Sequence, residues 1–261
     1  MDDGPPSRIP QLADPALAGR HAWLAGLLAP AAGERVVDLG CGESPILGLV
    51  RARLDGGLAV GIDHSAEALR ELGTSLPAAP SPTLLVRSDL AGPLPLADRS
   101  IDAAFSHDVL EQLPDPDALL REVHRVLRPG GRFVLGHADF DTVVIAGADL
   151  ALTRRLVHAY CDTQHAWLPR ADGTIGRRLP EIVLRSPLEL ARATARVLLT
   201  RSLEAGGFGR FAIDHFVGAL AQAGAASPSE LARWRAELEA AAARGAFLLS
   251  LNDYVVVATR R

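Results

Sequence analysis

The 261-residue sequence predicts an α/β fold built on a doubly wound, mostly parallel sheet. Two observations predict it. Short apolar runs alternate with helical patterns along the first half of the chain, and several of these runs end in an acidic residue. The first run, residues 35–39, meets Gly40 and Gly42, and a helical pattern follows at once. A strand, a tight turn and a helix in this order let backbone approach a nucleotide-like ligand.

Composition narrows the class of protein. An apolar fraction of 48% permits a sizeable core, and no apolar run approaches the ~20 residues of a membrane span. The first residues lack the pattern of a signal peptide, and two cysteines make no disulfide framework, so a cytoplasmic location is expected. A net charge of −4 without a long basic run argues against nucleic acid as a partner. All basic residues are arginine, so no lysine nucleophile is available.

The glycine turn is the best-defined local signal. Ser44 is a plausible N-cap and Pro45 suits the first position of the helix that follows. A dinucleotide fingerprint would need a third glycine where Pro45 stands, which weakens a nicotinamide-cofactor interpretation.

The next two predicted strands also end in acids. Residues 57–63 form a buried strand closed by Asp63, and Ser65 can cap the following helix. Asp63 lies about 20 residues past the glycine turn, where this architecture places a carboxylate against ribose hydroxyls, and the same carboxylate would repel a 2′-phosphate. Residues 83–90 form a third strand with Asp89 at its end, and nearby prolines predict a loop after it.

Residues 100–106 are the fourth predicted strand. Asp115 as N-cap and Pro116 at the first position begin a helix that ends at Arg128-Pro129-Gly130-Gly131. Residues 132–137 are the fifth predicted strand.

These motifs, taken together over residues 35–139, resemble class I S-adenosylmethionine (SAM)-dependent methyltransferases. The family's first motif is D/E-x-G-x-G-x-G, and this chain has Asp38, Gly40 and Gly42, with Ser44 at the last glycine. Residues 106–131 resemble the family's S-x-x-V-L-E-H-L…R-V-L-R-P-G-G signature, with Gln112 where histidine is common. The resemblance implies a Rossmann-like seven-stranded sheet with an antiparallel last strand and a helical cover. It also implies SAM as cofactor and S-adenosylhomocysteine (SAH) as product.

The resemblance assigns roles to individual residues. Asp89 would accept from the adenine amino group while Leu90 lends its backbone N–H. Arg20, on a leading helix predicted for residues 14–28, would meet the methionine carboxylate; the alternative is a solvated helix face. The expected cofactor-binding set is Arg20, Asp38, Gly40, Gly42, Asp63, His64, Asp89, Leu90, Ser106 and His107.

Beyond Ala138 the chain has no family motif. Helices are expected at 149–162, 210–223 and 229–244, and a closing strand at 246–258, while 188–199 is compatible with a sixth strand or a helix. Residues 164–179 are rich in turn formers and lie where look-alike enzymes insert an acceptor-binding cover. We therefore divide the chain into a tail and covering helix (1–34), a SAM-binding core (35–139), an acceptor-binding cover (140–185) and closing elements of the same domain (186–261).

Catalytic candidates are expected beyond the carboxyl ends of strands four and five. His107 is the leading candidate for a base or a pocket-lining residue, and the alternative is a loop histidine beside adenine. His137 and Asp139, with Asp108 and Asp141 nearby, are further candidates, although a strand end needs polar residues simply to meet water. An acceptor pocket is expected among His165, Trp167, Asp172 and Arg177. No metal site is expected.

The acceptor is expected to be a small molecule. The fourth strand lacks the [DN]-P-P-[FY] of nucleic-acid amino methylases. Carboxylates near strand five suggest a cationic acceptor, whereas Arg177 and Arg178 suggest an anionic one, so its charge stays open. The protein is expected to be a monomer or homodimer without a membrane partner. Two alternatives remain: a nicotinamide-dependent oxidoreductase, and a SAM-fold binding protein without turnover.

Overall fold

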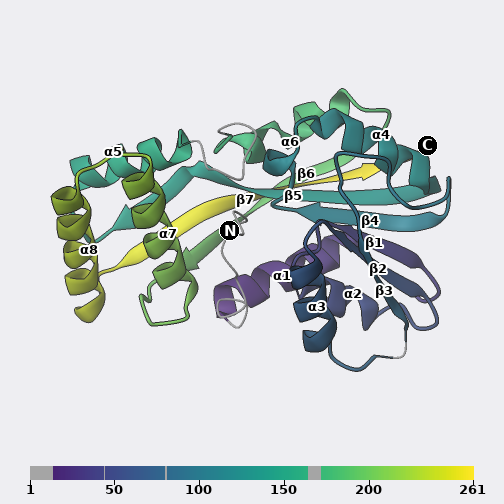
Figure 1. Ribbon diagram of the computed structural model, residues 1–261, viewed down its shortest axis with the longest axis horizontal. Helices are drawn as coiled ribbons and strands as arrows, with labels where there is room; N and C mark the ends of the chain where they lie inside the picture. The colour runs from purple at the N-terminus through teal and green to yellow at the C-terminus, as the bar shows by residue number, and fades with distance from the viewer. Residues whose placement is uncertain (1–13, 44, 80, 164–171) are drawn as a thin grey trace. The chain divides into compact units, whose positions relative to one another are not determined.

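The computed structural model describes residues 14–43, 45–79, 81–163 and 172–261, and Figure 1 labels its elements. The strands are β1 (Arg35–Leu39), β2 (Leu58–Asp63), β3 (Thr83–Arg87), β4 (Ile101–His107), β5 (Leu127–Ala146), β6 (Glu189–Thr200) and β7 (Leu248–Thr259). The helices are α1 (Pro15–Leu28), α2 (Ile46–Arg51), α3 (Ala66–Ser75), the 3-10 turn η2 (Leu110–Gln112), α4 (Pro116–Val126), α5 (Leu150–Cys161), α6 (Ile175–Leu184), α7 (Phe208–Gln222) and α8 (Pro228–Ala243). Among the described helices none combines the length and apolar character needed to cross a bilayer.

The strands form one seven-stranded sheet in the order β3-β2-β1-β4-β5-β7-β6, which confirms the predicted sheet. The pairs β3–β2, β2–β1, β1–β4 and β4–β5 are parallel. The amide of Gly130 donates to the carbonyl of Arg260 (2.8 Å) and the amide of Arg260 donates to that of Gly131 (2.9 Å), so β7 runs against β5. The chain reverses its direction of winding between β1 and β4. Ligands of open α/β sheets bind at such a point, beyond the carboxyl ends of the strands.

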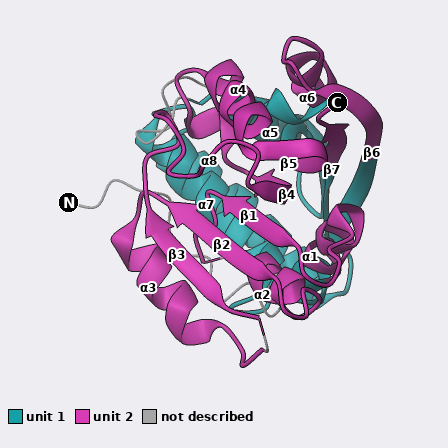
Figure 2. Cartoon of the chain, turned by 90° about the vertical axis from the view of Figure 1, so that its right-hand side faces the viewer, with its two compact units in different colours: residues 1–18, 138–177, 195–253 teal, residues 19–137, 178–194, 254–261 magenta. Residues whose placement is uncertain are grey.

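The chain divides into two compact units, coloured separately in Figure 2. The first, here called the sheet unit, comprises residues 19–137, 178–194 and 254–261. The second, here called the helical unit, comprises residues 1–18, 138–177 and 195–253. The strands β5, β6 and β7 each contribute residues to both.

Each unit has its own apolar core. In the sheet unit α2 packs on β2, and α3 packs on β2 and β3 (Figure 2). Val36, Leu47 and Leu54 are fully buried there. In the helical unit α5, α7 and α8 enclose Leu156, Ile213 and Trp234, all with no exposed surface. Both cysteines are buried and free.

Local chemistry explains most element boundaries. The Ser65 hydroxyl accepts from the amide of Ala68 (3.1 Å), and Asp115 caps α4 ahead of Pro116, both as predicted. Residues 189–200 are a strand, which resolves the ambiguity at 188–199. The predicted cap Ser44 lies outside the described residues. Pro45 is itself the N-cap of α2 rather than its first helical residue.

In the middle of the chain one prediction was wrong and one helix was missed. Strand five does not end at His137 but continues to Ala146, because burial keeps alternating through Val143, Val144 and Ile145. Asp139 and Asp141 therefore lie inside a strand rather than after it. The helix α6 was not predicted, because Gly176 and the internal Pro180 obscure its apolar pattern.

Candidate functional site

The glycine turn is fixed to the neighbouring strand by backbone hydrogen bonds. The amides of Gly40 and Cys41 both donate to the carbonyl of Ile62, at 2.8 and 3.1 Å. Gly40 has φ +77°, and a Cβ there would lie 2.4 Å from Cγ2 of Val109. The residue is glycine because the segment after β4 packs directly on the turn and the dihedral disfavours a side chain.

Asp63 braces the turn from the end of β2. One carboxylate oxygen accepts from the amide of Gly42 (2.8 Å), and the other accepts from the amide of Ser65 (2.8 Å). The predicted members Gly42 and Asp63 are therefore brought together. A Cβ on Gly42 would have open space around it, with Asp63 the nearest neighbour at 4.0 Å, so the turn leaves room on that side.

Asp38 is the least satisfied acid of the site. It is 3% exposed, and its Oδ2 has no hydrogen-bond partner among the described residues. Burial, and then the charge of Asp63, raises the pKa of the Asp38 carboxyl well above its usual range. The same burial, with the charges of Asp38 and Asp63, raises the pKa of the Cys41 thiol, so this cysteine is no nucleophile.

These residues fit a SAM-like ligand. A buried carboxylate oxygen without a partner calls for a donor or a cation, and SAM carries both an ammonium and a sulfonium. Asp63 directs its carboxylate to the turn that would face a ribose, and each of its oxygens retains accepting capacity beside the amide it already binds.

The other predicted cofactor residues have mixed environments. His64 is largely exposed, and its Nδ1 lies 3.4 Å from Asp63. Asp89 is exposed and accepts from the amide of Ala91 (2.9 Å), a turn-forming bond, while the adjacent Leu90 is buried. The hydroxyl of Ser106 donates to the carbonyl of Leu39 (2.8 Å), so it ties β4 to β1.

Arg20, His107 and Asp108 form a buried polar group at the end of β4. Nη2 of Arg20 lies 3.1 Å from Oδ2 of Asp108 and 3.2 Å from Nδ1 of His107. Arg20 is 7% exposed, so the alternative of a solvated helix face was wrong. Burial acts to raise the pKa of Asp108, but the charges of His107 and Arg20 outweigh it and hold that pKa well below its usual range.

Glu111 is a residue of this group that the prediction missed. Its Oε2 contacts Nε2 of His137, and Nδ1 of His137 lies 3.8 Å from Oδ1 of Asp108. The sequence carried a signal for it, because Glu111 occupies the acidic position of the Val-Leu-Glu motif. His137 and His107 are thus joined through Asp108 within the sheet unit.

Comparison with known proteins agrees with this geometry. Residues 37–135 match the methyltransferase domain family. The match confirms, for this part of the chain, the predicted resemblance to class I, SAM-dependent methyltransferases. The chain is 39% identical over 158 residues to an uncharacterised 37.1 kDa protein in a transposon of Streptomyces fradiae (58% of this chain, 42% of that protein). It is 40% identical over 96 residues to trans-aconitate 2-methyltransferase of Azoarcus sp. (37% and 36%).

The chain covers less than half the length of either relative. In fold, it is similar to a Bacillus halodurans protein that carries a provisional methyltransferase name. The two share a TM-score of 0.61 and 12% identity, over 93% of this chain and 99% of that one.

Asp139 belongs to the helical unit and is fully buried. Arg177 binds both of its oxygens, through Nε and Nη2 at 2.7 Å each, and the amide of Arg177 donates to Oδ2 (3.1 Å). Nη2 of Arg177 also lies 3.0 Å from Asp141. Arg177, which suggested an anionic acceptor, is therefore paired with the carboxylates that suggested a cationic one. His165 and Trp167 of the predicted acceptor pocket lie outside the described residues.

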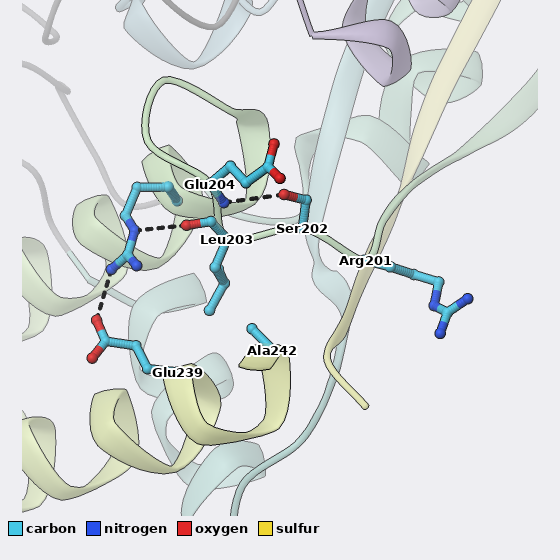
Figure 3. Close-up of a pocket in the computed structure, with 7 residues that line it drawn as sticks. Arg201, Ser202, Leu203, Glu204, Glu239 and Ala242 are labelled. Atoms are coloured by element: carbon cyan, nitrogen blue, oxygen red, sulfur yellow. Dashed lines mark hydrogen bonds and ion pairs between the residues drawn. The ribbon is translucent and has the colours of Figure 1, made fainter. Parts of the chain in front are cut away.

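The helical unit also has a surface hollow of about 380 Å³, lined by Arg201, Ser202, Leu203, Glu204, Arg210, Glu239 and Ala242 (Figure 3). Its polar groups bind one another. Arg210 donates to the carbonyl of Leu203 (3.1 Å) and to Glu239 (2.8 Å), and Arg201 points away from the others. None of the predicted site residues lines it.

Proposed function

We propose that the protein transfers a methyl group from SAM to a small-molecule acceptor by in-line displacement. The proposal rests on the glycine turn and the two acids beside it. Asp63 accepts from the amide of Gly42, and Oδ2 of Asp38 is buried without a hydrogen-bond partner among the described residues. The trans-aconitate methyltransferase to which the chain is similar acts, by its name, on a small acid, which supports a small acceptor here.

The bound cofactor would supply an activated methyl group on a sulfonium. In the proposed complex Asp63 accepts hydrogen bonds from the ribose hydroxyls, and Asp38 faces the ammonium of the cofactor. Asp89 accepts from the adenine amino group, and the amide of Leu90 donates to the adenine ring. The remaining proposed cofactor-binding residues are Gly40, Gly42, His64 and Ser106. Alignment of the reacting groups and exclusion of water contribute on the order of 7–11 kcal/mol to such a transfer.

Arg20 is proposed to meet the methionine carboxylate of the cofactor, and His107 and His137 are the proposed residues around the transferred group. A base adds about 10²–10⁴-fold in rate, and only for an acceptor that must lose a proton. Asp139 was a catalytic candidate in the sequence, and we propose a positioning role for it instead. Since Arg177 occupies both of its oxygens, we assign Asp139 to positioning the start of α6.

Calorimetric titration with SAM, SAH and NAD tests this proposal. Binding of SAM and SAH without binding of NAD is expected, and NAD binding would favour the alternative of a nicotinamide-dependent oxidoreductase. Labelled SAM incubated with the low-molecular-weight and macromolecular fractions of a cell extract then tests the acceptor class. Label should enter the small-molecule fraction; transfer only to macromolecules would refute a small acceptor, and a lack of transfer to either would favour a binding protein without turnover.

A further inference from the structure

Burial and the lack of a hydrogen-bond partner for Oδ2 among the described residues determine whether Asp38 is protonated in the ligand-free protein. Asp38 stands on β1 with all but 3% of its surface buried, and the structure gives its Oδ2 no donor and its carboxylate no ion pair within the described residues. An isolated buried charge is unfavourable, and such a group neutralises by taking up a proton.

Asp63, the second acid of the site, is the less favourable position for this proton. The two oxygens of Asp63 are each stabilised by a backbone amide, from Gly42 and from Ser65. Among the described residues, Oδ2 of Asp38 has no such donor, and Asp38 also feels the charge of Asp63. Two carboxylates sharing a site rarely ionise together, so the proton goes to the acid that lacks donors, which is Asp38.

We propose that Asp38 carries a proton in the ligand-free protein and releases it when a nucleoside that bears an ammonium group, such as SAM or SAH, binds. This inference rests on the proposed function. The ammonium of the ligand supplies the positive charge that the site lacks, so the ionised form of Asp38 becomes the stable one. The Asp38 O–H bond breaks, its electron pair stays on the carboxylate oxygen, and the proton passes to the buffer.

Linkage gives the direction of the effect on affinity. Where the free protein holds the proton and the complex does not, the association constant rises with pH, by up to about tenfold per pH unit. The other titratable groups of the turn and its flanks are Cys41, Glu43, Asp63 and the exposed His64, which lies 3.4 Å from Asp63. As the histidine beside Asp63, His64 needs its own control.

Calorimetry of SAH binding at pH 6, in two buffers of different ionisation enthalpy, counts the protons released. We expect a release of up to one proton per site from the wild type and from His64→Gln, and none from Asp38→Asn. A matched ligand control is 5′-methylthioadenosine, which lacks the ammonium and should bind without releasing a proton. Equal heats in the two buffers, or a release that persists in Asp38→Asn, would overturn the proposal while leaving SAM binding intact.

A spectroscopic measurement keeps the test decisive if Asp38→Asn does not fold. Infrared difference spectra of the wild type should lose the band of a protonated carboxyl group on SAH addition, and a spectrum without that change contradicts the proposal. Failure of SAH to bind at all would instead refute the proposed function.

Discussion

Asp63 is the residue whose contribution to cofactor binding can be isolated most directly, because its two oxygens accept hydrogen bonds from backbone amides. We expect Asp63→Ala to weaken SAM binding by about tenfold or more, since hydrogen bonds to a charged group contribute roughly 1.5–3 kcal/mol each. Isothermal titration of SAM into wild type and variant measures the change.

The matched control is Asp98→Ala, an exposed acid of the same unit whose recorded partner is Arg125. It should leave SAM affinity within about twofold, because exposed pairs contribute little. Unchanged affinity in Asp63→Ala would remove Asp63 from the site.

Asp108 should make the protein sensitive to acid. Its folded-state pKa lies below the unfolded value of about 3.9, so its stabilising contribution is full above that value and is lost as pH falls through the folded pKa. Asp108→Asn keeps the backbone at φ +54°, which asparagine tolerates, and removes only the charge.

We expect Asp108→Asn to lower the free energy of unfolding by about 3–5 kcal/mol at pH 7, because the variant loses the largely buried ion pair between Arg20 and Asp108. The difference should shrink as pH falls below about 4. Denaturant titrations across pH measure it. A difference that does not change with pH would show that the carboxylate's charge has no part in the effect.

At the scale of elements, the turn between β1 and α2 depends on the packing of the segment after β4. Gly40→Ala places a Cβ against Val109 and strains a φ of +77°, so we expect a loss of about 1–3 kcal/mol in stability together with weaker SAM binding. Thermal melts and SAM titrations test both effects.

Gly218→Ala, in α7, is the control, because a Cβ there would meet nothing within 4 Å. It should be neutral or stabilising by up to about 1 kcal/mol, as expected for glycine inside a helix. Equal effects of the two substitutions would contradict the proposed role of the turn.

The helix α6 is attached to β5 through Asp139. Asp139→Asn cannot accept both guanidinium bonds of Arg177, so we expect a loss of about 1–3 kcal/mol and faster hydrogen exchange at the amide of Arg177. Asp141→Asn, at an exposed acid that also contacts Arg177, should cost under about 1 kcal/mol. If exchange at Arg177 is unchanged in Asp139→Asn, the attachment lies elsewhere.

The sequence predicted those elements whose signals are local. The Ser65 cap, the Asp115-Pro116 start of α4 and the glycine turn each depend on residues a few positions apart. The contact between Glu111 and His137 joins residues 26 positions apart and follows from the register of β4 on β5, with His107 opposite Gly136. No single-sequence pattern fixes that register, so the polar group around Asp108 needed the structure.

At the scale of the whole molecule, the two units share strands β5, β6 and β7, so the chain cannot be cut into two continuous pieces that match them. Two tryptophans report on the units separately. Trp234 is fully buried in the helical unit and donates to Thr153 (3.0 Å), and Trp23 lies on the part of α1 in the sheet unit. Variants that retain one or the other, with the remaining tryptophans replaced by phenylalanine, give one fluorescent reporter per unit.

We expect both reporters to unfold at one temperature, because loss of either unit leaves three strands half-paired. SAH at about 100 times its dissociation constant adds about 2.7 kcal/mol, which corresponds to a shift of roughly 5–10 °C in a chain of this size. The proposed SAH contacts lie mainly in the sheet unit, so an equal shift at Trp234 would mean that the shared strands transmit the stabilisation. A shift at Trp23 alone would mean that the helical unit unfolds independently of the cofactor.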